Sequence, residues 1–457
     1  MKRLTRRSFL AASAAFGAGP AFGAPRQKPA PKPEEPGPPR SGKVDIVVVG
    51  AGAAGIAAAR RLSASRGLKF VVLEATGQVG GRCITDNKTF GVPFDRGAHW
   101  IYSADINPLV RLGAQTGLEI YPAPPGQRLR VGRRYAREGE LEDFLATLVR
   151  TNHALATAAR GRADISADKA LPKDLGEWRQ TIEFATGPFT CGKDLNEVSA
   201  VDLARAVHRD NNSYCRQGLG TLLAKLLPAD VLLTDTPVNR IMYWGRGPVE
   251  VQSNRTLFTA RAVIVTASTN VLTSGKIDFQ PNLPKGYLDA LRKLKLGSYD
   301  HIALELPGNP LGLRPDELTF EKSENRQTAS IFGNVLGSTV CVVDVAGSFG
   351  RELSAKGERA MIDFALTWLG ELYGTDMKSI VKRTAATRWN ESPWVMGAIS
   401  SAEPGAHPSR KALTESLRGR VFLAGEATHE TLWGTVGGAW ESGERAAEAA
   451  LRALGRR

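Results

Sequence analysis

The chain has 457 residues and a formal net charge of +14, with 42% hydrophobic and 23% charged residues. This length and composition exclude disorder of the whole chain and a small scaffold held together by disulfides or a metal ion. Glycine is abundant at 48 residues, which favours tight turns and backbone that approaches a ligand closely.

The first 43 residues are predicted to be an export signal and a linker. Residues 1–24 place Arg6 and Arg7 ahead of a weakly apolar run rich in Ala and Gly, which is the pattern of a signal peptide and is too short for a membrane helix. Residues 5–10, Thr-Arg-Arg-Ser-Phe-Leu, resemble the twin-arginine export motif. That resemblance implies bacterial export machinery as a partner and a location in the periplasm. Residues 25–43 are dense in Pro and predict an extended linker.

The charge and the cysteines of the remaining chain indicate no further partner. Removal of the signal takes away four basic residues and no acidic one, and no later basic cluster is interleaved with aromatic residues. We therefore expect no nucleic-acid binding and, because no later run approaches ~18 apolar residues, a soluble mature chain. The cysteines, Cys83, Cys191, Cys215 and Cys341, lack the spacing of a zinc site, so no metal is expected. They allow two disulfides, but buried thiols are favoured in a protein that folds before export.

Two apolar runs around a glycine-rich turn predict a βαβ unit. Residues 44–49 are a β-branched run that fits a buried parallel strand. Residues 56–65 favour a helix, and residues 69–73 predict a second strand.

The turn between the first strand and the helix has the glycine spacing of a dinucleotide site. Gly50 permits the tight turn, Gly52 lets the backbone approach a pyrophosphate, and Gly55 lets the helix pack closely. Glu74 ends the second strand at the distance expected of an acid that accepts hydrogen bonds from ribose hydroxyls. Strand, glycines, helix, strand and acid in this order predict dinucleotide binding.

Residues 74–82, Glu-Ala-Thr-Gly-Gln-Val-Gly-Gly-Arg, resemble the E-A-x-x-x-x-G-G-R signature of the flavin-containing amine oxidase family, which includes monoamine and polyamine oxidases. Residues 94–101, Phe-Asp-Arg-Gly-Ala-His-Trp-Ile, are similar to a D-x-G-A-x-W-I segment of that family. Near the C-terminus, residues 420–426 predict a strand ending in Gly-Glu, and residues 434–439 are similar to the family's Thr-Val-x-Gly-Ala turn. A helix is expected over residues 444–454.

The resemblance covers nearly all of residues 44–457 and implies an α/β plus α+β fold. In it, a Rossmann-like FAD-binding domain is interleaved with a substrate domain of mixed sheet and helix. The implied FAD-binding domain comprises residues 44–101, 221–279 and 411–457, and the substrate domain comprises residues 102–220, which should be largely helical, and 280–410. Further strands are predicted at residues 231–238, 239–244, 249–253, 262–267, 302–306 and 340–345, and helices at residues 141–160, 195–208 and 352–373.

The resemblance implies FAD as the cofactor and a set of residues that bind it. These are Gly50, Gly52, Ala53, Ala54, Gly55, Glu74, Ala75, Gly80, Gly81, Arg82, Ala98, His99, Trp100, Val238, Trp389, Gly425, Glu426, Thr435, Val436 and Ala439. Ala398 occupies the position that bears a flavin-linked cysteine in some relatives, so we predict non-covalent FAD.

The sequence departs from the family where an aromatic cage would face the flavin. Many relatives have two aromatic residues there, and the matching positions are Ile399 and Thr435. Trp389, Trp394 and Trp433 are candidates for a replacement wall, with packing in a core as the alternative.

A second departure concerns a lysine that holds a water near the flavin in the family. Its position falls on His301, which can hold the same water and act as a base near neutral pH. The alternative register puts Lys295, or no residue, in this role. His99 resembles a polyamine-oxidase residue that lies near the substrate amine, and the alternative is a His that caps local backbone.

Three functions remain open. The first is an FAD amine oxidase, which transfers a hydride from the carbon next to a primary or secondary amine, including a polyamine, to flavin N5. The resulting imine hydrolyses, and O2 or an electron-carrier protein takes the electrons. The second is an L-amino-acid oxidase, which needs an Arg for the carboxylate, with Arg128, Arg130 and Arg388 as candidates. The third is a non-catalytic FAD-binding protein. A homodimer also remains open.

Overall fold

The computed structural model describes residues 41–206, 211–374 and 376–456. These residues form one compact unit. The predicted signal, and the linker up to residue 40, lie outside the described residues. Strand β1 (Gly42–Val49) begins earlier than predicted, so residues 42 and 43 of the predicted linker belong to this strand.

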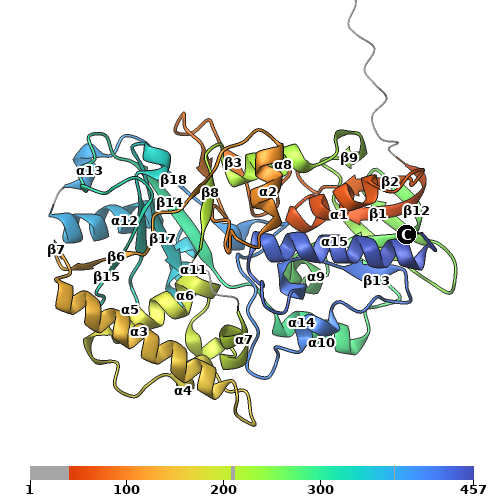
Figure 1. Ribbon diagram of the computed structural model, residues 1–457. Coiled ribbons are helices and arrows are strands. Elements are labelled where there is room, and N and C mark those ends of the chain that lie inside the picture. Colours follow the sequence, from red (N-terminus) through yellow and green to blue (C-terminus); the bar gives the residue numbers. More distant parts are fainter. Residues whose placement is uncertain (1–40, 207–210, 375, 457) are drawn as a thin grey trace, which may run out of the picture. The chain divides into compact units, whose positions relative to one another are not determined.

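A sheet of eight strands carries the predicted FAD-binding segments (Figure 1). Besides β1 its strands are β2 (Phe70–Leu73), β9 (Leu232–Leu233), β10 (Val238–Met242), β11 (Val249–Ser253), β12 (Leu257–Val265), β13 (Asp278–Gln280) and β19 (Val421–Leu423). Their order is β13-β10-β11-β12-β1-β2-β9, and β19 pairs with β12. The strand predicted over residues 231–238 is interrupted after β9, because Asp235 has a φ of 50° that no regular strand accommodates.

The central strands of this sheet end together. Val49 of β1 pairs with Leu73 of β2 and with Val265 of β12, and Val265 pairs in turn with Leu423 of β19. All three strand pairings are parallel. The carboxyl ends of four parallel strands therefore lie at one edge, which is where α/β sheets bind ligands.

Two helices cover one face of this sheet and pack against each other, α1 (Ala53–Ser63) and α15 (Val436–Ala453) (Figure 1). A Cβ on Gly443 of α15 would lie 2.0 Å from the carbonyl oxygen of Ala54, so glycine is required for their close approach. Helix α15 begins eight residues before the predicted start at residue 444. The glycines at 437 and 438 read as a turn, but the side chain of Thr435 caps the helix in front of them.

A second sheet of seven strands has the order β18-β14-β17-β16-β15-β6-β7. Its strands are β6 (Arg128–Val131), β7 (Arg134–Tyr135), β14 (Tyr299–Glu305), β15 (Glu317–Glu321), β16 (Ser330–Gly333), β17 (Val340–Ala346) and β18 (Thr384–Ala386). Helices α11 (Gly347–Ala355) and α12 (Glu358–Tyr373) pack against β14. They replace the single helix predicted over residues 352–373, because Gly357 between them has a φ of 98°.

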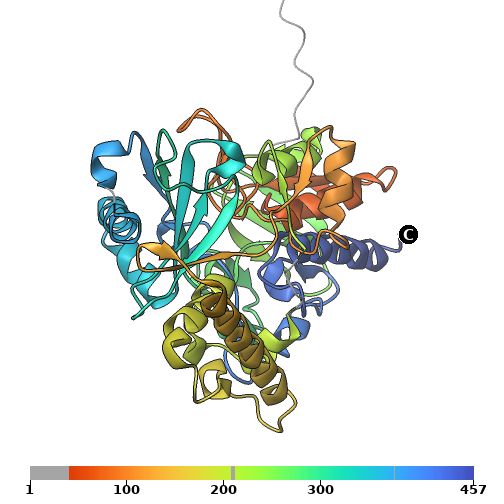
Figure 2. The ribbon, with the colours of Figure 1, turned by 60° about the vertical axis from the view of Figure 1, so that its left-hand side comes forward.

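A group of helices packs against β6 and β15 through a buried cluster that includes Phe144, Trp178 and Phe320 (Figure 2). They are α3 (Glu138–Ala158), α4 (Ala167–Ala170), α5 (Arg179–Thr186), α6 (Pro188–Cys191) and α7 (Ala200–Arg205). Helix α7 is shorter than the helix predicted over residues 195–208, whose end lies partly outside the described residues, because Ser199 caps α7 at Asp202. The first predicted substrate block also contains the strands β5 (Ile120–Pro122) and β8 (Ser213–Cys215), so it is less helical than predicted.

Shorter elements complete the chain. They are the strands β3 (Thr85–Asp86) and β4 (Phe94–Asp95) and the helices α2 (Pro108–Gln115), α8 (Leu219–Leu226), α9 (Thr269–Thr273), α10 (Lys285–Lys293), α13 (Met377–Ile380) and α14 (Ser409–Ala412). All four cysteines lie in described segments and are buried thiols. Across those segments, no helix has both the length and the apolar character needed to span a membrane.

Candidate active site

A cavity lies where the central strands of the eight-stranded sheet end, and the residues that follow these strands line it. Gly50 follows β1, Glu74 follows β2 and Thr266 follows β12. Between β1 and α1, Gly50 has a φ of 99° and Gly52 caps the helix. The first turn of α1 contains no acidic residue, so the positive end of its dipole faces the cavity uncompensated.

Three segments form what we call the glycine cradle: residues 50–54, residues 80–82 and Gly425. Gly52 forms a parallel bridge with Gly80, and the N–H of Gly80 donates to the carbonyl of Ala51 at 2.8 Å. A Cβ on Gly425, where φ is 138°, would meet no heavy atom within 4 Å, so its backbone borders open space. Gly55, which was predicted to bind the cofactor, does not line the cavity. Its Cβ would lie 1.9 Å from the carbonyl oxygen of Gly50, so it allows the helix to pack beneath the turn.

Glu74 is buried, and its carboxylate braces the cradle. One oxygen accepts the N–H of Ala51 at 2.8 Å, and the other accepts the N–H and hydroxyl of Thr76, each at 2.9 Å. A carboxylate has about four lone-pair sites, so Glu74 retains acceptor capacity for the hydroxyl groups assigned to it from the sequence.

Arg82 and Glu426 form an ion pair on the cavity wall. Arg82 Nη1 lies 2.9 Å from Glu426 Oε1 and also donates to the carbonyl of Ala398. The other oxygen of Glu426 accepts the hydroxyl of Ser400 at 2.5 Å and the N–H of Gly434 at 2.9 Å. Burial raises the pKa of Glu426, but Arg82 and these hydrogen bonds outweigh it and lower the pKa below its usual value.

Helix α15 also begins at this cavity. Its N-cap Thr435 accepts the N–H of Gly438 at 2.9 Å and donates its hydroxyl to the carbonyl of Leu432 at 2.7 Å. Thr435, Val436 and Ala439 line the cavity, and no acid stands in the first turn. The hydroxyl of Thr435 therefore caps a helix whose positive end faces the cavity.

An aromatic wall also lines the cavity, and we define it as Trp100, Tyr102, Phe189, Tyr299 and His301. Tyr299 and His301 lie on β14 of the second sheet, and Phe189 lies on α6. Their rings contact one another, with centroids 6.0 Å apart for Phe189 and Tyr299 and 5.7 Å apart for Trp100 and Phe189. Tyr102, Phe189 and Tyr299 were not predicted from the sequence. The signal for Tyr299 was present, because residues two apart on a strand share a face and His301 had been selected.

His301 lies on the cavity, but both of its ring nitrogens are already bonded to the protein. Nδ1 is 2.5 Å from Asp344 Oδ1, and Nε2 is 2.9 Å from the carbonyl oxygen of Gly97. A carbonyl oxygen only accepts, so Nε2 carries a proton. Burial lowers the pKa of His301, but Asp344, its cross-strand partner in β17, outweighs burial and raises it. The geometry contradicts the predicted role of His301 as a free base or water ligand. Lys295, the alternative, is exposed and away from the cavity.

His99 also lies on the cavity. Burial, together with the charge of His301, lowers the pKa of His99 to about 4. Its Nε2 is buried and has no hydrogen-bond partner among the residues that the structure describes. The ring stacks on Phe332 at a centroid distance of 5.0 Å and lies 5.5 Å from the ring of His301.

The three tryptophans proposed as a replacement wall have different surroundings. Trp389 and Trp394 line the cavity, and Trp394 lies under Lys276 Nζ at 5.4 Å. Trp433 does not line the cavity, contrary to its predicted role. Its indole is fully buried beside Cys191, and its Nε1 donates to the carbonyl of Asp202 at 3.2 Å. Ile399 lines the cavity as predicted, as do the remaining proposed cofactor residues, Ala75, Ala98 and Val238.

The sequence pattern of the family described as Flavin containing amine oxidoreductase matches residues 53–451. The chain belongs to this family. It is similar to human Lysine-specific histone demethylase 2, with 25% identity over 436 residues that cover 88% of this chain and 53% of the relative. It is also similar to Lysine-specific histone demethylase 1 homolog 2 of Arabidopsis thaliana, with 29% identity over 449 residues that cover 89% of this chain and 58% of the relative. The chain thus spans about half the length of these relatives.

Solved structures of amine oxidases share the fold. Cyclohexylamine oxidase from Brevibacterium oxydans IH-35A matches with a TM-score of 0.75 and 20% identity, over 90% of this chain and 100% of that one. Wild-type putrescine oxidase bound to putrescine matches with a TM-score of 0.74 and 18% identity, over 90% and 99% of the two chains. The predicted fold class is confirmed, and membership of the flavin-containing amine oxidoreductase family implies a flavin cofactor.

The cavity of this family member fits a flavin dinucleotide. Two helices, α1 and α15, direct uncompensated positive ends at it, which suits a pyrophosphate and an electron-rich ring. Bare backbone at Gly52 and Gly425 allows close approach, and Glu74 supplies an acceptor at the end of β2. The residues that would hold FAD are therefore those of the glycine cradle, Glu74, Val238 and the start of α15.

Proposed function

We propose that the protein oxidises a primary or secondary amine with FAD bound non-covalently. The observation that carries this proposal is the single cavity that joins the glycine cradle to the aromatic wall. The carboxylates on its lining, Glu74 and Glu426, both accept hydrogen bonds from protein donors, and neither belongs to the aromatic wall. The wall is therefore suited to a neutral amine with an apolar substituent.

The chain's own residues bind, orient and desolvate the substrate. When bound, FAD supplies the acceptor for a hydride from the carbon beside the amine nitrogen. Trp100, Phe189 and Tyr299 exclude water from that carbon and disfavour the charged ammonium form. His301 offers no lone pair, since Gly97 and Asp344 take both nitrogens. The amine thus enters without its extra proton, and the imine product hydrolyses in water.

Two residues on the lining support non-covalent FAD. Ala398 has no nucleophile at the position of the flavin-linked cysteine in some relatives. Cys83 is a cysteine on the lining, and burial raises the pKa of its thiol to about 12, which keeps it protonated and unreactive. Acid precipitation should release the yellow chromophore into the supernatant.

The reading as an L-amino-acid oxidase finds no support at the cavity. Arg128, Arg130 and Arg388 are absent from its described lining. Arg128 pairs with Glu317, and Arg130 donates to the carbonyl of Leu372. The cations that do line the cavity are Arg82, already paired, Lys276 and the engaged His301.

A substrate panel tests the proposal. The panel contains putrescine, cyclohexylamine, a spermidine-type polyamine, an N-methyl-lysine peptide and L-amino acids, and it is mixed anaerobically with the holoenzyme. We expect the flavin absorbance to bleach with at least one amine, and peroxide to form when air is admitted. Bleaching by amino acids alone would favour the amino-acid oxidase. A flavin that no compound bleaches would favour a non-catalytic FAD-binding protein.

The surroundings of the reaction are part of the same proposal. We propose export by the twin-arginine route to the periplasm, with O2 or an electron-carrier protein as electron acceptor and a homodimer as an assembly to be tested. The Arg6-Arg7 motif supports the export route, and the resemblance to relatives supports the electron acceptor and the dimer. Cell fractionation of the full-length chain tests the location, with Arg6→Lys/Arg7→Lys as the control.

A further inference from the structure

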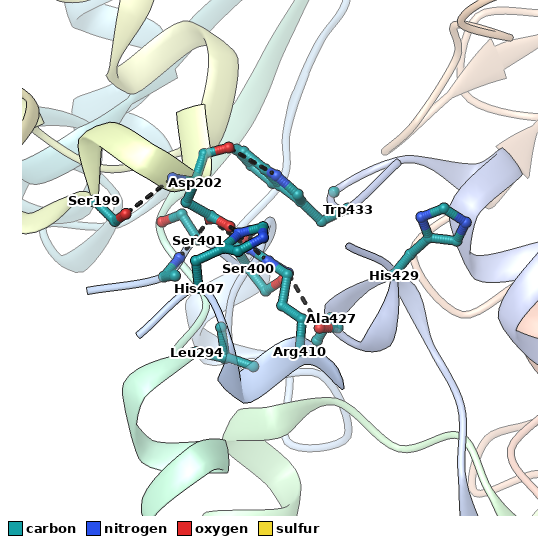
Figure 3. A network of polar contacts seen from close by, with 12 residues as sticks. Ser199, Asp202, Leu294, Ser400, Ser401, His407, Arg410, Ala427, His429 and Trp433 are labelled. Carbon is teal, nitrogen blue, oxygen red and sulfur yellow. Dashed lines mark hydrogen bonds and ion pairs between the residues drawn. The ribbon is translucent and has the colours of Figure 1, made fainter. Parts of the chain in front are cut away.

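A buried polar network joins α7 to α14 (Figure 3). At its centre, Arg410 of α14 donates from Nε and Nη2 to the two oxygens of Asp202 of α7, at 2.8 and 2.7 Å. Both side chains have an exposed fraction of 0%. Such a pair is stable only when further hydrogen bonds satisfy both ions. Asp202 also accepts from the ring of His407 at 2.9 Å and from the N–H of Ala402 at 2.8 Å.

One side chain connects this pair to the cavity. Arg410 Nη1 lies 3.2 Å from the hydroxyl of Ser400, which in turn donates to Glu426 at 2.5 Å. Glu426 lines the cavity and holds Arg82 and the N–H of Gly434. The charges therefore alternate in sign from Asp202 in the core, through Arg410 and Glu426, to Arg82 on the cavity.

The network also holds the turn that precedes α15. Trp433 lies beneath the guanidinium of Arg410 at 4.8 Å, and its Nε1 donates to the backbone carbonyl of Asp202. Arg410 Nη1 donates in addition to the carbonyl of Ala427 at 3.1 Å. Segments from both predicted substrate blocks thus meet the last FAD-binding segment at this one cation.

We propose that Ser400 and Arg410 are positioning residues that hold Glu426 ionised and in one orientation at the cavity wall and so set the affinity for FAD. Rotation of Glu426 would take the carboxylate away from Arg82 and from the N–H of Gly434, and protonation would remove the negative charge opposite Arg82. Both groups border the region that would hold FAD. The inference rests on the flavin cofactor and not on the amine, so it is tested without any substrate, and failure of the amine proposal leaves it intact.

If the proposal is right, the affinity for FAD should depend on pH through the pKa of Glu426. Burial raises this pKa, and the opposing groups are Arg82, the hydroxyl of Ser400 and Arg410. The other titratable groups near the network are Asp202, His407 and Lys193, and Lys193 Nζ donates to the carbonyl of Ser401 at 3.1 Å. Loss of the Ser400 link raises the pKa of Glu426, so FAD binding weakens as pH falls, beginning at a higher pH than in the wild type.

Ser400→Ala and Ser401→Ala form a matched pair of variants. The two serines are adjacent and both have an exposed fraction of 0%, but within the described chain the hydroxyl of Ser401 has no hydrogen-bond partner. Holoenzyme of each variant is diluted stepwise at pH 8 and pH 5.5, and the rise of free-flavin fluorescence gives the Kd for FAD. We expect Ser400→Ala to raise this Kd about tenfold at pH 8, as for a lost hydrogen bond to a charged group, and further at pH 5.5. Ser401→Ala should stay within about twofold of the wild type at both pH values.

A second variant tests the ion pair without leaving a lone buried charge. The double change Asp202→Leu with Arg410→Met removes both ions, and such replacements are commonly neutral or stabilising. It should retain thermal stability yet show the weakened, pH-dependent Kd of Ser400→Ala. Equal effects of Ser400→Ala and Ser401→Ala would overturn the proposal. So would a double variant whose Kd and pH dependence match the wild type, because the network would then be purely structural.

Discussion

The glycine cradle and the aromatic wall line one cavity but are built in different ways. The cradle consists mostly of backbone and includes the start of α1, and its essential property is the absence of side chains at Gly52 and Gly425. The wall consists of side chains from separate elements, with Phe189 from α6 and Tyr299 from β14. A surface made of backbone tolerates no added atom, whereas a surface made of side chains can be reshaped one residue at a time. We expect changes in the cradle to abolish cofactor binding, and changes in the wall to alter substrate use with the cofactor still bound.

The largest effect is expected from Gly52→Val. A Cβ at this position would have its nearest neighbour, Gly81 Cα, at 3.8 Å, so the protein itself accommodates the branch. The side chain would instead occupy the space that a pyrophosphate needs. We expect FAD affinity to fall at least ~100-fold, or about 2.7 kcal/mol, with the melting temperature of the cofactor-free protein unchanged. Flavin content per chain measures this, and Gly139→Val, where a Cβ meets nothing within 4 Å, is the control. Normal flavin content in Gly52→Val would show that the cradle is not the phosphate site.

The contrast also explains how far the sequence could predict the site. Gly50, Gly52 and Glu74 were identified because turn, helix and strand end are contiguous and each backbone requirement selects a residue type. Phe189 and Tyr299 were not identified, because they are 110 positions apart and meet only once α6 packs on the second sheet. For the fold, the central strands were predicted within a few residues, since buried parallel strands read as continuous apolar runs.

Two further errors concern residues whose partners the sequence did not show. Thr435 was matched to a cage position, but its hydroxyl caps α15 and moves the start of that helix to Val436. His301 was assigned the role of the family lysine, but the sequence could not show that Asp344 faces it across the sheet. Contacts between distant strands depend on register, which the local pattern does not determine.

Asp344→Asn tests the contact that holds His301 of the aromatic wall in place. The pKa of His301 is lowered by burial and raised by Asp344, with a net rise. A raised pKa in the folded state gives stabilisation that is fully present below the unfolded pKa of about 6.5 and is lost as pH rises through the folded pKa. We therefore expect the melting temperature of the wild type to fall as pH rises through the folded pKa of His301. The variant should lose about 2 kcal/mol of unfolding free energy at pH 6 and less at pH 9.

Thermal unfolding between pH 5 and pH 9 measures this difference. Glu305→Gln is the control, since Glu305 lies on β14 like His301 but pairs with the half-exposed Arg383. It should lower the stability by less than about 1 kcal/mol. A pH-independent loss in Asp344→Asn would mean that His301 does not titrate between the two states.

A smaller effect, confined to the substrate, is expected from Tyr299→Leu. Leucine retains much of the buried volume, but it removes the ring contacts to Phe189 and His301, at centroid distances of 6.0 and 5.6 Å. We expect kcat/KM for the preferred amine to fall about tenfold, since one aromatic contact contributes roughly 0.5–1.5 kcal/mol beyond burial. Flavin content should stay at the wild-type level. Steady-state kinetics measure this. Tyr287→Leu is the control, because Tyr287 is another tyrosine with a buried hydroxyl but packs against the core of the eight-stranded sheet. A variant that loses flavin would mean that the wall also holds the cofactor.

The smallest effect on catalysis is expected from Trp433→Phe, although Trp433 was a candidate for the wall. The structure places its ring in a core with Cys191 and Val198, and phenylalanine keeps a ring beneath Arg410. The change removes the hydrogen bond from Nε1 to the carbonyl of Asp202, which should lower the free energy of unfolding by about 1 kcal/mol. Because no atom of the ring lines the cavity, kcat and KM for the amine should each stay within about twofold of the wild type. Trp394→Phe provides the comparison, since Trp394 does line the cavity and is 36% exposed. If Trp433→Phe changed KM more than Trp394→Phe, side chains behind the cavity would control substrate binding as strongly as those on it, and the distinction between cradle, wall and core would fail.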